Sequence, residues 1–111
     1  MRAVDLAVYA DALAARRLVV SARLERARAQ AAEAAIERAA VVALPHGTVL
    51  ALEESGVLAH GDGLELASRE VDRLARAVAA IDELQTWIEH RLAAALDDAL
   101  ERRPGGAGGR A

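Results

Sequence analysis

The stretch LARAVAAIDELQTWIEHRL, residues 74–92, decides the fold of this chain. One row of positions in it recurs at alternating spacings of four and three residues, namely Leu74, Val78, Ile81, Gln85, Ile88 and Leu92. A period of about 3.5 residues is typical of the contact line of a coiled coil. All members of the row except Gln85 are apolar, while Arg76, Glu83 and His90 recur every seven residues on the polar side. The pattern predicts a long amphipathic helix that packs along another helix.

A second long helix is predicted at the start of the chain, because residues 3–43 contain neither Gly nor Pro. Pro45 disfavours helical geometry at Leu44, so this helix should end there. The last helix is expected over about residues 63–103, where no Gly or Pro interrupts the run between Gly63 and Pro104. Asp62 has a side chain suited to cap its first turn.

The connector, residues 44–62, holds a Pro and several Gly residues, which are typical of turns. Within it we expect Thr48 to cap a short helix over Val49–Ser55, with Gly56 ending that helix in the left-handed conformation. A small β-hairpin over residues 57–67 is the alternative. Residues 104–111 form a Gly-rich segment that we expect to be disordered. The fold prediction is an all-α, antiparallel two-helix hairpin domain over residues 1–103.

The two long helices offer complementary apolar rows if they pair with their ends aligned. That register sets Leu6 opposite Leu100, Ala31 opposite Leu74, and Trp87 against Val19 and Val20. The predicted helix-packing core consists of Leu13, Leu24, Leu74, Val78, Ile81, Trp87, Ile88 and Leu92.

Apolar residues outside these rows make the apolar stripe wider than one partner helix covers. The predicted interaction surface consists of Leu18, Val19, Leu84, Leu96 and Leu100. We expect a second copy of the chain to cover it, giving a homodimeric four-helix bundle. The alternative is a monomer, since scattered apolar residues are normal on protein surfaces.

Composition excludes several kinds of chemistry. The chain has no Cys, and its basic residues are all Arg, which removes thiolate and lysine nucleophiles and is typical of a GC-rich bacterial genome. His46, His60 and His90 do not form the Glu-x-x-His pattern of di-iron bundles. We therefore predict no catalytic residues, no metal and no cofactor. No apolar run is long enough to cross a membrane, and Asp5 and Asp11 interrupt the position of a signal peptide, so we expect a cytoplasmic protein.

Three resemblances give alternative functions. Residues 48–67 resemble the end of a winged-helix domain, with strands at Val57–His60 and Leu64–Ala67, which implies a DNA-binding regulator. Residues 39–68 contain no Arg or Lys and four acidic residues, a charge balance that opposes binding to phosphates. We therefore expect no nucleic-acid partner.

Residues Ile81 to Arg91 are similar to a segment of the all-helical chorismate mutases, which implies a small helical-bundle enzyme but lacks the Lys of those sites. The layout also resembles small secreted helical hairpins with Trp-x-Gly in the turn, although the only Trp here is Trp87. The residues themselves favour a helical protein–protein interaction or assembly module without catalysis.

Overall fold

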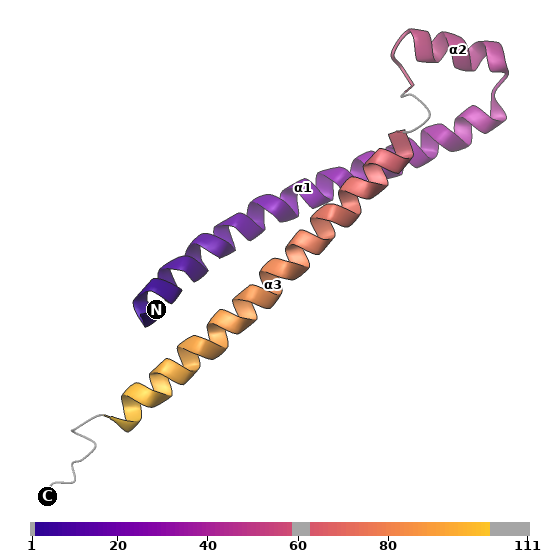
Figure 1. The fold of residues 1–111 in the computed structure, drawn as a ribbon. Helices are drawn as coiled ribbons and strands as arrows, with labels where there is room; N and C mark the ends of the chain where they lie inside the picture. The colour runs from indigo at the N-terminus through magenta and orange to yellow at the C-terminus, as the bar shows by residue number, and fades with distance from the viewer. Residues whose placement is uncertain (1, 59–62, 103–111) are drawn as a thin grey trace, which may run out of the picture. The chain divides into compact units, whose positions relative to one another are not determined.

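The computed structural model describes residues 2–58 and 63–102, and all the regular structure within these ranges is helical. The helices are α1 (Ala3–Ala43), α2 (His46–Glu54) and α3 (Gly63–Glu101). α1 and α3 pack against each other as an antiparallel hairpin, with α2 in the connection between them (Figure 1). The predicted all-α hairpin is confirmed, and the connector contains a helix.

Pro45 separates α1 from α2. The Leu44 amide still donates to the carbonyl of Ala40 at 3.1 Å. Pro45 has no N–H, so it cannot continue the helical hydrogen bonds of α1. The Pro45 carbonyl instead accepts from the amides of Thr48 and Val49 at 3.0 and 3.1 Å. Our prediction that Thr48 caps a helix beginning at Val49 is wrong, because α2 begins at His46 with Pro45 as its N-cap and without a side-chain cap.

Gly56 ends α2 as predicted. Its φ of 77° lies in the left-handed region, which a residue without Cβ adopts at little cost. The Gly56 amide donates to the Glu53 carbonyl at 3.1 Å, and the Val57 amide donates to the Leu52 carbonyl at 3.0 Å. This is the hydrogen-bond pattern of a Schellman cap, and it satisfies carbonyls that the helix end would leave without partners.

The connector does not contain the strand pair of the winged-helix interpretation. Leu64–Ala67 lies inside α3, so the second of the two strands is helical. The predicted cap Asp62, His60 and the predicted disordered tail, residues 104–111, lie outside the described residues.

The described chain divides into two compact units. Unit 1 combines residues 2–18 with residues 79–102, and unit 2 consists of residues 19–58 and 63–78. The core of unit 1 is a cluster of Leu6, Leu13 and Ile88, against which the part-buried Ala10, Ile81, Leu84 and Leu92 pack. The core of unit 2 is a cluster of Leu24, Ala27 and Leu74, against which the part-buried Val20, Val71, Ala75 and Val78 pack.

The pairing of the helices is shifted from the prediction toward the start of α3. Arg17 of α1 bonds Asp82 of α3, whereas aligned helix ends would set Arg17 opposite Glu89. Leu6 is buried with Ile88, and its predicted partner Leu100 is exposed. Because a heptad pattern presents an equivalent row after each seven residues, both registers bring apolar positions together, and the pattern alone does not choose between them.

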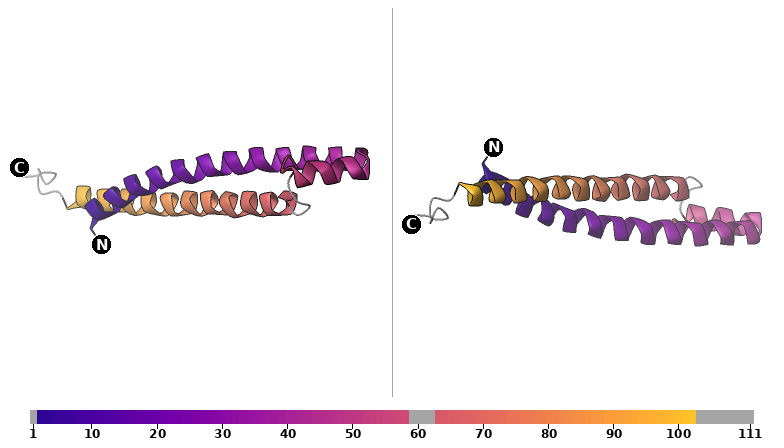
Figure 2. Two further views of the ribbon diagram at one scale, coloured as in Figure 1. Left: turned by 90° about the horizontal axis from the view of Figure 1, so that it is seen from above. Right: turned by 90° about the horizontal axis from the view of Figure 1, so that it is seen from below.

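In each unit one long helix has an end that the other long helix does not accompany. In unit 2, α2 turns back alongside the last part of α1, and its Val49 is buried (Figures 1 and 2). In unit 1, α3 continues past the first turn of α1 (Figure 2). Every residue from 93 to 101 is exposed, and Ala94, Ala95 and Asp98 line a groove with Ala3 and Leu6 of α1.

Candidate interaction surface

Three of the residues predicted to form the interaction surface are exposed leucines of unit 1. Leu18 on α1 is 72% exposed, and Leu96 and Leu100 on α3 are 60% and 55% exposed. Leu96 and Leu100 are four residues apart, so they lie one turn apart on the same side of the uncovered helix end. The structure thus presents a pair of neighbouring leucines that no described residue covers.

The other two residues predicted for this surface lie elsewhere. Leu84 is part-buried and packs against the core of unit 1, so it offers a partner less surface than the exposed leucines do. Val19 is exposed and belongs to unit 2. Leu84 differs from the expectation because it lies four residues before Ile88, on the same side of α3, and so packs against the Leu6, Leu13 and Ile88 cluster.

The structure also exposes large apolar residues that the sequence analysis did not single out. They include Val4 and Val8 in unit 1 and Ile36, Val42, Val57 and Leu66 in unit 2. Val4 and Val8 are four residues apart on one helix, a spacing visible in the sequence.

Most residues predicted for the helix-packing core lie between the helices. Leu13 and Ile88 are buried in unit 1, and Leu24 and Leu74 are buried in unit 2. The part-buried members pack against the same clusters, Ile81 and Leu92 in unit 1 and Val78 in unit 2.

Trp87 departs from the core prediction. Its side chain is 48% exposed, and the Arg91 guanidinium carbon lies 5.2 Å from the centroid of its ring. Trp87 directly precedes the buried Ile88, so it is turned about 100° round the helix from the contact line. The indole therefore flanks the core of unit 1 and stacks with a cation outside it.

A groove runs beside this stacked pair in unit 1. Leu6, Ala94 and Ala95 contribute apolar surface, and Trp87, Arg91 and Asp98 stand beside it. Arg91 makes no ion pair with a described residue, whereas Asp98 pairs with Arg102 at 3.2 Å. Trp and Arg dominate the binding energy of many protein interfaces, which makes this groove the second candidate contact surface.

One ion pair joins the two helices of unit 1. Arg17 donates to both carboxylate oxygens of Asp82, from Nε at 2.6 Å and from the terminal nitrogen at 3.2 Å. These hydrogen bonds lower the pKa of Asp82 below its usual value and raise the pKa of Arg17. Both side chains remain partly exposed, so water screens the pair.

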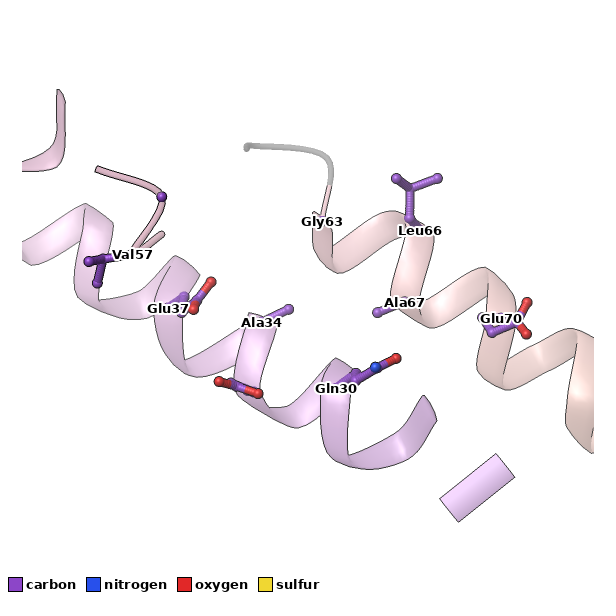
Figure 3. A pocket seen from close by; sticks show the side chains of 10 residues that line it. Gln30, Ala34, Glu37, Val57, Gly63, Leu66, Ala67 and Glu70 are labelled. Atoms are coloured by element: carbon purple, nitrogen blue, oxygen red, sulfur yellow. The ribbon is translucent and has the colours of Figure 1, made fainter. Parts of the chain in front are cut away.

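Unit 2 contains a groove between α1 and α3 near the start of α3. Figure 3 shows Ala34 and Ala67 pointing toward one another across it, with Gln30 and Glu37 on α1 and Glu70 on α3. None of the described residues that line it is basic. Glu70 accepts from Arg73 at 2.6 and 2.9 Å, and these bonds lower the pKa of Glu70. Small facing residues leave the space here, and one of its carboxylates, that of Glu70, is paired with Arg73.

The described residues offer little for metal or membrane chemistry. No three His, Asp or Glu side chains among them are grouped so that they could hold a metal ion. Within residues 2–58 and 63–102, no helix combines the length and apolar content needed to cross a bilayer.

Comparison with known proteins adds no relative. Neither protein families, nor characterised sequences, nor solved structures gave a match to the chain.

Proposed function

We propose that the chain is a helical protein-interaction module, without catalysis, that assembles with further copies of itself. The observation that carries this proposal is the uncovered end of α3, where Leu96 and Leu100 are exposed side by side. Fully burying one such side chain contributes about 1.5–3 kcal/mol, which is the ordinary driving force of association between helices. Leu18, exposed on α1 of the same unit, adds apolar surface of the same kind.

The modest size of the core supports the same proposal. In unit 1 only Leu6, Leu13 and Ile88 are buried apolar residues, and the chain as a whole has 111 residues. Small domains bury a low fraction of their surface and often obtain part of their stability from oligomerisation. A second copy would cover apolar groups that the single hairpin leaves in water.

Light scattering after gel filtration tests the proposal. The wild-type protein should have a mass of at least twice the 11.7 kDa of one chain. The double variant Leu96→Gln with Leu100→Gln should be monomeric, with an unchanged helical circular dichroism spectrum. The matched control is Ile36→Gln, which alters an exposed apolar residue of unit 2 and should leave the mass unchanged. A wild-type monomer at high micromolar concentration contradicts the proposal.

A further inference from the structure

The end of α3 carries two unlike surfaces on opposite sides. Leu96 follows Trp87 by nine residues, and Leu100 follows Arg91 by nine residues. Nine residues are two and a half turns of a helix with about 3.6 residues per turn, so each leucine points away from its groove residue. The leucine pair and the Trp87–Arg91 groove therefore lie on opposite sides of one helix within unit 1.

The groove has small residues beside its polar ones. Besides Trp87, Arg91 and Asp98 it is lined by Ala3, Leu6, Ala94 and Ala95, three of which are small. The leucine pair is the usual form in which one helix enters the groove of another, with anchors at positions i and i+4. A groove lined by alanines leaves room for two such anchors.

The two surfaces are also complementary in charge. Asp97 and Glu101 directly follow the two leucines, and neither makes an ion pair with a described residue. On the groove side, Arg91 is stacked on Trp87 and likewise makes no ion pair with a described residue, while the groove's Asp98 is paired with Arg102. Arg2, Arg17 and Arg102 of the same unit have carboxylate partners, and Arg16, which has none among the described residues, does not line the groove.

We infer that the groove beside Trp87 and Arg91 receives the Leu96–Leu100 side of α3 from a second copy of the chain. The two leucines lie on the apolar lining, and Asp97 or Glu101 of the incoming helix pairs with Arg91. This inference rests on the proposed function, because it names the receiving surface for the same leucines.

The geometry determines the symmetry of the assembly. A two-fold dimer joins the same patch of both copies, whereas here one patch joins a different patch. Each chain keeps a free groove or a free leucine pair after the first contact. Such head-to-tail contacts give closed rings or open filaments, so the mass should exceed that of two chains as concentration rises.

Mixing two variants tests the inference. The groove variant Trp87→Gln with Arg91→Gln and the leucine variant Leu96→Gln with Leu100→Gln should each be monomeric when pure. Because each retains one intact surface, an equimolar mixture should form a dimer of two chain masses and nothing larger. Circular dichroism of each pure variant, with a melting temperature close to that of the wild type, verifies that both fold.

The outcomes separate this inference from the proposed function. If the wild type associates but the mixture stays monomeric, or if the groove variant still associates, self-assembly stands and the groove is not its receiving surface. A mass of two chains that does not rise with concentration overturns the head-to-tail geometry in favour of a two-fold dimer. A monomeric wild type overturns both proposals.

Discussion

Unit 1 and unit 2 are built from the same two long helices but fill the space between them differently. In unit 1 the buried residues are Leu6, Leu13 and Ile88, which are all large. In unit 2 the buried Ala27 of α1 lies with Leu24 and Leu74. The buried residues of the cluster are all large in unit 1, whereas the cluster of unit 2 includes one small buried residue, Ala27.

This difference changes how each unit should respond to mutation. A core of large side chains loses most when one of them is truncated or made polar, because a cavity or a buried charge results. A core that depends on alanine loses most when the alanine is enlarged, because the helices must move apart.

Ile88→Asp should have the largest effect. Ile88 is 1% exposed, and a carboxylate there would be buried without a partner. We expect a loss of at least about 4 kcal/mol, comparable to the whole stability of a small domain. Urea denaturation followed by circular dichroism measures it, with His90→Asp at an exposed position two residues later as control. A folded Ile88→Asp protein of near wild-type stability would show that the core of unit 1 is misplaced.

Ala27→Leu should destabilise the protein by about 2 kcal/mol, which is typical of overpacking. Ala27 is 3% exposed and lies in the cluster with Leu24 and Leu74, so a larger side chain here crowds these two neighbours. The matched control is Ala29→Leu, an exposed position on the same helix, which should change stability by less than about 0.5 kcal/mol. An equal change in stability for Ala27→Leu and Ala29→Leu would show that the core of unit 2 does not depend on a small residue at position 27.

Much of the fold could be predicted from the sequence, because helix formation and its interruption are local. The run without Gly or Pro over residues 3–43 and the position of Pro45 predicted the bounds of α1. The left-handed conformation of Gly56 could be predicted too, because it depends only on the absence of a side chain at that residue. These features depend on backbone geometry within a few residues.

The register could not be predicted, because apolar positions recur along both helices and more than one alignment brings them together. The observed alignment left Leu100 without its predicted partner Leu6. The position of Trp87 was missed for a related reason, since a large aromatic residue beside a contact line was assigned to the line itself. The groove next to Arg91 could not be predicted either, because it is lined by residues of both α1 and α3 and depends on how the two helices pair.

Gly56→Ala should destabilise the protein by about 1 kcal/mol, because an L side chain rarely adopts a φ of 77°. Gly47 is the matched position in the same connector, as it lies inside α2 with nothing within 4 Å of an added Cβ. Gly47→Ala should instead stabilise by about 0.5 kcal/mol, because Ala favours helix. Thermal melts should therefore shift in opposite directions, and a stabilising Gly56→Ala would contradict the cap in unit 2.

Asp82→Asn should have the smallest effect, because the Arg17–Asp82 pair that it removes from unit 1 is partly exposed. The folded state lowers the pKa of Asp82, so its contribution to stability is present above the usual value of 3.8 and is lost as pH falls through the lower folded value. The gap in urea midpoint between wild type and Asp82→Asn should thus be present at about pH 7 and disappear at about pH 2. Glu83→Gln, which removes a neighbouring carboxylate without an ion pair to a described residue, should show no such gap. A gap that persists in acid would mean that the side chain acts through packing and not through its charge.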